Sequence, residues 1–169
     1  MYRRMDELEP PDLHHRNAAV GWLELGCPRE ARAELLRISE AHQQRREVLE
    51  LHWRICAEET DWPTALAVAR QLVHGDPGNP TGWIHQSYSL HELKRTEEAH
   101  GQLLGVAEQF SRISTVAYNL ACYACQLGQP EEARRWLNRA IQLEGKDRIK
   151  AMALSDSDLI PMRDEIQGL

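Results

Sequence analysis

Small and hydrophobic residues recur along this chain with a fixed period of 34 residues. The strictest column holds only alanine, at Ala31, Ala65, Ala99 and Ala133. Apolar residues follow these alanines at spacings of four and seven, which place them on one face of an amphipathic helix. A repeat of this length is typical of helical arrays, in which each helix pair packs against its neighbours. The period therefore predicts an all-α fold built from stacked helix–turn–helix units.

The apolar stripes and the residues between them predict where each helix begins and ends. Gly26 and Gly128 suit the C-terminal ends of helices, where glycine adopts a left-handed conformation at little cost. Pro28 and Pro80 suit the first helical turn, where the missing N–H group would have no partner. Trp22 falls in a packing column, so we expect its ring in the core. The predicted helices span residues 12–25, 28–41, 46–59, 62–75, 80–93, 96–109, 114–127 and 130–143.

Two stretches carry the sequence pattern of a known repeat family. The fourth unit contains Asn119-Leu-Ala-Cys-Tyr-Ala-Cys-Gln-Leu-Gly-Gln-Pro-Glu-Glu-Ala133, and the first contains Trp22-Leu-Glu-Leu-Gly-Cys-Pro-Arg-Glu-Ala31. These residues resemble the tetratricopeptide repeat (TPR) family, whose units of about 34 residues are helix–turn–helix pairs. The resemblance implies a right-handed α-α superhelix that serves as a non-enzymatic scaffold for binding proteins or peptides.

The resemblance also divides the chain into segments. It covers four repeats, at 12–45, 46–79, 80–113 and 114–147, and we expect residues 1–11, which end in Pro10-Pro11, to form an N-terminal leader. Beyond residue 147 the period stops, and Ser155-Asp-Ser-Asp158 is similar to the Asp-x-Asp-Leu segment that follows the last repeat of many bacterial relatives. A terminal repeat has an apolar side that needs a cover. We therefore expect residues 148–169 to form capping helices, and a partner-binding role for this tail stays open.

Composition narrows the function further. The net charge of −6 argues against a nucleic-acid-binding protein, because phosphate contacts need a basic surface. No apolar run reaches the length of a membrane span, and the N-terminal residues lack the apolar core of a secretory signal. Four cysteines in 169 residues do not suggest a disulfide framework. We expect a cytoplasmic protein without cofactor or enzymatic activity that is a monomer or a weak homodimer.

The resemblance implies that the first helix of each repeat lines a peptide-binding groove. The predicted groove residues are Arg16, Val20, Leu23, Glu47, Glu50, Leu51, Arg54, Ile84, His85, Tyr88, His91, Tyr118, Asn119, Cys122 and Cys125. The best-known subgroup of the family clamps a carboxylate with fixed cations, but Val20, Leu51, Thr81 and His85 stand at the companion positions here. Because the predicted groove is apolar, aromatic and acidic, we expect it to bind a neutral, basic or apolar segment.

Cys122 and Cys125 suggest a different function. Residues three apart on a helix share a face, so both thiols would point into the groove beside His91. Two cysteines and a histidine could hold zinc, which makes a metal- or thiol-dependent regulatory domain the alternative. The second Cys-x-x-Cys of a zinc ribbon is missing, however, and Cys122 lies in mid-helix, where no helix N-terminus lowers its pKa. We therefore predict no metal site. A chaperone-like secretion or assembly factor and a self-assembling structural unit are further alternatives.

Overall fold

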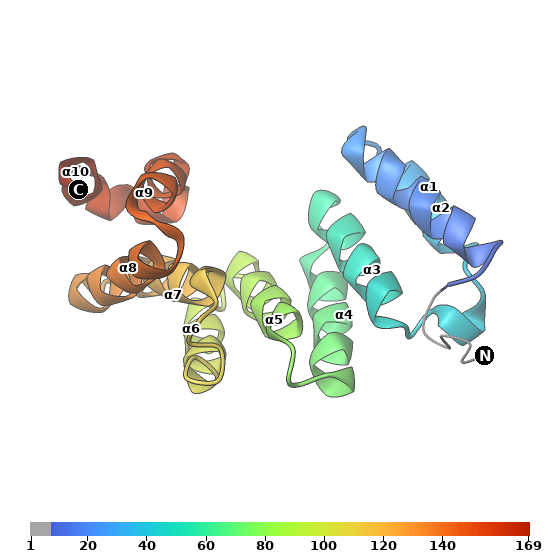
Figure 1. Cartoon of the computed structure of the whole chain (residues 1–169), viewed down its shortest axis with the longest axis horizontal. Coiled ribbons are helices and arrows are strands. Elements are labelled where there is room, and N and C mark those ends of the chain that lie inside the picture. Colours follow the sequence, from blue (N-terminus) through green and yellow to red (C-terminus); the bar gives the residue numbers. More distant parts are fainter. Residues whose placement is uncertain (1–7) are drawn as a thin grey trace. The chain divides into compact units, whose positions relative to one another are not determined.

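The computed structural model describes residues 8–169, which fold into α-helices joined by turns and contain no β-strand (Figure 1). The all-α prediction is confirmed. The chain divides between Asp76 and Pro77 into two compact units, here called the first and the second unit. None of the helices in the described residues is both long and apolar enough to span a membrane.

The first unit consists of two helix pairs. α1 (Asp12–Glu24) packs against α2 (Pro28–Leu35), and α3 (Arg46–Glu58) packs against α4 (Trp62–Gly75). The two pairs stack, because both α1 and α2 contact α3. A short 3₁₀ turn, η1 (Glu40–His42), lies in the connection between them. The stacking buries one face of each helix, as the apolar stripes predict.

The second unit has two further pairs and a C-terminal extension. α5 (Pro80–Glu92) packs against α6 (Thr96–Gly105), and α7 (Ser114–Gln126) packs against α8 (Pro130–Glu144). The extension consists of α9 (Lys146–Ser155), the 3₁₀ segment η2 (Ser157–Met162) and α10 (Arg163–Gly168). α9 packs against α8, whereas η2 packs against α7. The extension therefore reaches both helices of the last pair.

The turn inside each helix pair has one backbone conformation that recurs every 34 residues. Gly26, Thr60, Lys94 and Gly128 have positive φ angles of 71°, 56°, 62° and 72°. Each of them donates its N–H to the carbonyl three residues earlier, and the next residue donates to the carbonyl five residues before it. These two bonds define a Schellman motif. Thr60 and Lys94 thus adopt a left-handed backbone conformation that glycine adopts with less strain.

The alanine column is fully buried within the helix pairs. Ala31, Ala65, Ala99 and Ala133 are each 0% exposed. Small side chains at these positions allow the two helix axes of a pair to approach. The expectation for Trp22 is wrong, since this residue is 38% exposed. It lies on α1, on a side of the helix that the described residues leave partly exposed.

In the first and third repeats, the second helix is shorter than the repeat pattern predicts. α2 ends at Leu35, although the pattern predicts a helix as far as residue 41, and α6 likewise ends at Gly105 instead of residue 109. Gln43 compensates for the early end of α2. Its side-chain amide donates hydrogen bonds to the carbonyls of Leu35 (3.2 Å) and Ile38 (2.7 Å), which continuation of the helix would otherwise have satisfied.

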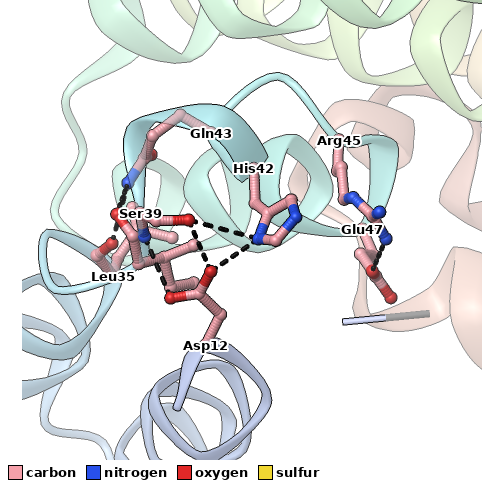
Figure 2. Close-up of polar contacts among 8 residues, drawn as sticks. Asp12, Leu35, Ser39, His42, Gln43, Arg45 and Glu47 are labelled. Carbon is pink, nitrogen blue, oxygen red and sulfur yellow. Dashed lines mark hydrogen bonds and ion pairs between the residues drawn. The ribbon is translucent and has the colours of Figure 1, made fainter. Parts of the chain in front are cut away.

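Asp12, at the start of α1, holds the segment that follows α2 (Figure 2). Its carboxylate accepts hydrogen bonds from the Ser39 N–H (3.0 Å), the Ser39 hydroxyl (2.6 Å) and Nδ1 of His42 (2.5 Å). These interactions, with the Ser39 hydroxyl foremost, lower the pKa of Asp12 to about 2. The ionised form of Asp12 is therefore the form that stabilises this segment.

The end of the predicted leader contributes to the core of the first unit. Leu8 is 4% exposed and belongs to a cluster of buried residues that includes Ala19, Leu35 and Ile55. Residues 1–7 of the predicted leader lie outside the described residues. Leu8 thus packs as a core residue rather than extending away from the helices.

Candidate functional site

The C-terminal extension lies on the face of α7 that the repeat pattern predicts to bind a ligand. Asp156, directly before η2, accepts hydrogen bonds from the Tyr118 hydroxyl (2.9 Å) and the Cys122 thiol (3.6 Å). Its other oxygen accepts the N–H of Asp158 (2.9 Å), so Asp156 is the N-cap of η2. Within the second unit, the tail therefore covers part of the predicted groove.

Asp158 ties the same segment to α5 and to the end of α7. Its Oδ2 lies 3.0 Å from Nε2 of His91, and its backbone carbonyl accepts a hydrogen bond from the Gln126 amide (2.7 Å). A carboxylate only accepts, so Nε2 of His91 is the donor. Nδ1 of His91 lies 3.0 Å from the Thr96 hydroxyl. Both ring nitrogens of His91 are therefore engaged inside the protein.

These contacts decide which predicted groove residues remain accessible. His91 and Cys125 are 7% exposed, Tyr118 is 6% exposed and Cys122 is 4% exposed. The two thiols consequently do not face an open groove, because the tail packs on this side of α7. Tyr88 on α5 is 38% exposed and stays accessible.

A cavity of about 270 Å³ opens beside the tail in the second unit. We call it the α5–α7 cavity, and the wall residues that matter here are Tyr88, Tyr118, Asn119, Met152, Asp156 and Asp158. The wall also includes His91 and Cys122, so five of the predicted groove residues meet at this one place. The named wall residues come from α5, α7, α9 and the segment at the start of η2. The cavity thus combines aromatic, apolar and acidic groups.

The α5–α7 cavity has an excess of negative charge. Among the described residues that line it, Arg148 is the one Lys or Arg, and its guanidinium pairs with Glu144 at 2.9 Å. Within residues 8–169, no Lys or Arg forms an ion pair with Asp156 or Asp158. Burial, Glu92 and these two aspartates raise the pKa of Tyr88 to about 12. The raised pKa shows that the surroundings of Tyr88 disfavour further negative charge.

The thiols of Cys122 and Cys125 are protonated at neutral pH. Burial, followed by the charges of Asp156 and Asp158, raises the pKa of both above the usual range. Metal binding and nucleophilic chemistry need the thiolate. Among the described residues, no three His, Cys, Asp or Glu side chains are grouped as metal ligands. The structure therefore gives no support to a metal- or thiol-dependent function of Cys122, Cys125 and His91.

The predicted groove residues of the first unit do not form a comparable site. Leu23 and Leu51 belong to the core cluster and Val20 packs against it, so these side chains stabilise the fold. Glu50 pairs with Arg46 at 2.7 Å. The other charged residues predicted for this groove are Arg16, Glu47 and Arg54, which are half-buried or exposed.

Three predicted residues of the second unit lie away from the α5–α7 cavity. Ile84 and His85 are half-buried on α5, and Cys125 is buried on α7 without lining the cavity. Burial lowers the pKa of His85 to about 4, so its ring is neutral at physiological pH. The binding surface predicted from the repeats is therefore broader than the cavity.

The structure also brings together Asp12, Ser39 and His42, residue types that occur in hydrolytic triads (Figure 2). The Ser39 hydroxyl and the Asp12 carboxylate both approach the same ring nitrogen, Nδ1 of His42, at 3.2 Å and 2.5 Å. A catalytic triad uses the two ring nitrogens separately, one for the acid and one for the nucleophile. This cluster therefore fixes the segment after α2 and does not activate Ser39.

Asp156, Asp158 and Met152 are wall residues that the repeat pattern did not identify. The acidic pair was visible in the sequence as an Asp-x-Asp segment after the last repeat, where a cap was expected. The position of this segment after the last repeat indicated a cap. It did not indicate that the two carboxylates face α5 and α7.

Comparisons with known proteins agree with this architecture. Residues 114–147 match the tetratricopeptide repeat family model. These residues are therefore a tetratricopeptide repeat, and the chain has the fold of tetratricopeptide-repeat proteins. The match covers α7 and α8, the pair on which the tail packs. No curated protein sequence matches the chain.

Solved structures resemble the chain over most of its length. TTC0263, a thermophilic TPR protein of Thermus thermophilus, has 18% identity and a TM-score of 0.70, with 94% of this chain and 100% of that one covered. MamA of Desulfovibrio magneticus RS-1 has 17% identity and a TM-score of 0.71, with 96% and 94% covered. PilF of Pseudomonas aeruginosa has 21% identity and a TM-score of 0.72, with 91% and 69% covered. At these identities the likeness concerns the fold.

Proposed function

We propose that the second unit binds a protein or peptide segment at the α5–α7 cavity and carries out no chemistry. The tetratricopeptide fold supports protein–protein interaction scaffolds, and the chain has this fold. The observation that carries the proposal is the accessible cavity lined by Tyr88, a residue that is 38% exposed. Exposed aromatic rings next to a cavity supply contact area at little cost in side-chain entropy.

Asn119 supports the same proposal. Its side chain is half-buried in the cavity wall and makes no hydrogen bond to another described residue. A carboxamide both donates and accepts, which suits the N–H and carbonyl groups of a peptide backbone. The cavity wall thus offers a polar group that a bound segment would satisfy.

The wall is also preorganised. Tyr118 and His91 are held by hydrogen bonds to Asp156 and Asp158, at 2.9 Å and 3.0 Å. Side chains that are already fixed lose little further freedom when a segment binds, which leaves more of the contact energy as affinity. The packed helices and the attached tail therefore favour recognition of a segment in one defined position.

Selection of random peptides against the purified full chain tests this proposal. Peptides that bind are then titrated by fluorescence polarisation against the wild type, Tyr88→Ala and Trp22→Ala. Trp22 is a matched control, because it is also an aromatic residue that is 38% exposed but lies in the first unit. We expect Tyr88→Ala to weaken binding about tenfold, the effect of losing a central aromatic contact, and Trp22→Ala to leave it unchanged. Equal affinities for the wild type and Tyr88→Ala would show that the segment binds elsewhere.

A further inference from the structure

We propose that the α5–α7 cavity receives a lysine or arginine side chain of the bound segment, and that Asp156 and Asp158 of the chain's own tail hold its charge. The inference rests on the proposed binding function and names the chemistry of the partner. It also gives the C-terminal extension a second role, because the segment that covers α7 would supply the charged end of the site.

Asp156 accepts hydrogen bonds from neutral donors, Asp158 pairs with His91, and no Lys or Arg among the described residues pairs with either carboxylate. Asp156 accepts from the Tyr118 hydroxyl, the Cys122 thiol and the Asp158 N–H, none of which carries positive charge. Asp158 contacts His91 through Oδ2, and its Oδ1 makes no hydrogen bond to another described residue. Partly buried carboxylates that lack a cation gain more from an added charge-assisted hydrogen bond than fully solvated ones do.

Arg148, the one Lys or Arg among the described residues that line the cavity, already forms an ion pair. Arg148 pairs with one oxygen of Glu144 at 2.9 Å, and the other oxygen of Glu144 accepts the Ser114 hydroxyl. This pair is neutral as a unit, so it leaves Asp156 and Asp158 without a Lys or Arg partner among the described residues. An incoming cation would complement them, whereas an acidic side chain would be repelled.

The size and the lining of the cavity fit one long cationic side chain. Its volume of about 270 Å³ is below the roughly 300–1,000 Å³ typical of pockets for drug-sized ligands. Tyr88 and Met152 provide aromatic and apolar wall surface, on which the methylene stem of lysine or arginine can pack. The ring of Tyr88 also attracts a cation over its face. Apolar walls with acidic groups nearby thus match both parts of such a side chain.

The first test uses the wild-type chain alone. Among peptides selected from the random library, we expect lysine or arginine to be enriched at one position. Replacement of that residue by norleucine, which keeps the stem and removes the charge, should weaken binding at least about tenfold. The loss should shrink in high salt, where the interaction of partly exposed charges is screened.

The second test asks whether the two aspartates are the groups that bind the peptide cation. Asp156→Asn together with Asp158→Asn keeps the shape and one acceptor oxygen on each side chain but removes both charges. Asp147→Asn with Asp164→Asn is the matched control, since these acidic residues are exposed in the same unit and do not line the cavity. Circular dichroism verifies that both variants fold. We expect norleucine replacement to change affinity for the Asp156/Asp158 variant less than about twofold, but for the control as strongly as for the wild type.

The outcomes separate the two proposals. Tyr88-dependent binding without a preference for lysine or arginine would overturn the inference and leave the proposed function standing. The same holds for a cation preference that persists unchanged in the Asp156/Asp158 variant. Absence of any Tyr88-dependent peptide would contradict the proposed function itself. If the double variant does not fold, the norleucine comparison on the wild type still decides whether a cation is recognised.

Discussion

Each unit of this molecule has an aspartate that fixes an irregular segment, but the two aspartates differ in their donors. In the first unit, Asp12 receives the Ser39 N–H, the Ser39 hydroxyl and Nδ1 of His42 (Figure 2). In the second unit, Asp156 accepts hydrogen bonds from the Tyr118 hydroxyl, the Cys122 thiol and the Asp158 N–H. An imidazole can carry a compensating positive charge, whereas the donors of Asp156 cannot.

This difference separates a structural site from a candidate binding site. Asp12 is 6% exposed, and its hydrogen-bond partners come from one short stretch, so the cluster is closed. Asp156 and Asp158 border a cavity, and no Lys or Arg among residues 8–169 pairs with them. An aspartate with enough donors can therefore still be available to a ligand when none of those donors neutralises its charge.

The largest expected effect is that of Asp12→Ala on the first unit. This change leaves the donors of Ser39 and His42 without their acceptor and releases the segment after α2. We expect the free energy of unfolding of the first unit to fall by about 3 kcal/mol. Native-state hydrogen exchange of the amides from Leu8 to Asp76 measures it. Asp147→Ala, at an exposed position of α9, is the control and should leave the exchange of these amides unchanged. If Asp12→Ala lowers the free energy of unfolding by less than about 1 kcal/mol, the closed-cluster interpretation is wrong.

The same cluster predicts a dependence on pH. The pKa of Asp12 is about 2 in the folded chain against an ordinary value of 3.8. Because the folded pKa is the lower one, the stabilisation is fully present above the unfolded value and is lost as the pH falls through about 2. The difference in unfolding free energy between the wild type and Asp12→Asn should therefore shrink between about pH 4 and pH 2. Urea titrations at a series of pH values measure it, and a constant difference would show that Asp12 does not titrate as proposed.

Asp156→Ala should have a smaller effect, confined to the tail. The change removes the N-cap of η2 and the acceptor for Tyr118 and Cys122, but solvent in the cavity can replace part of what is lost. We expect amide exchange in η2 and α10 to correspond to a local loss of about 1–2 kcal/mol. Asp156→Asn keeps an acceptor oxygen and should lose less. Equal exchange in Asp156→Ala and the wild type would mean that buried apolar residues alone hold the tail.

The period of the sequence was enough to predict the fold, since packing between neighbouring repeats depends on local columns. The four buried alanines and the helix ends at Gly26 and Gly128 follow from it directly, whereas the same turn at Thr60 and Lys94 was seen only in the structure. The early end of α2 does not, because Asp12 and Ser39 are 27 residues apart and belong to different positions of the repeat. A contact of this kind breaks the periodic pattern and leaves no periodic signal.

The candidate site was predictable in part for the same reason. Tyr88, Tyr118 and Asn119 were identified from repeat positions, and all three border the cavity. Asp158 lies 67 residues after its partner His91, in a segment outside the repeats. The sequence indicated that a tail would cover the last repeat, but the face that it covers depends on η2 packing against α7.

The smallest expected effect compares the same turn in the two units. Thr60 and Lys94 hold left-handed backbone conformations, at φ of 56° and 62°, where the equivalent positions have Gly26 and Gly128. That conformation costs an L-residue about 1–2 kcal/mol. Replacement by glycine removes this strain but costs about 0.5–1 kcal/mol, because glycine loses more conformational freedom on folding. Thr60→Gly should therefore stabilise the first unit by about 0.5 kcal/mol. Lys94→Gly should stabilise the second unit by less, because lysine, unlike threonine, is not β-branched. Hydrogen exchange resolved by unit measures both, with Gly128→Ala as the destabilising control; a loss of stability in Thr60→Gly would show that its side chain contributes more than its backbone strain removes.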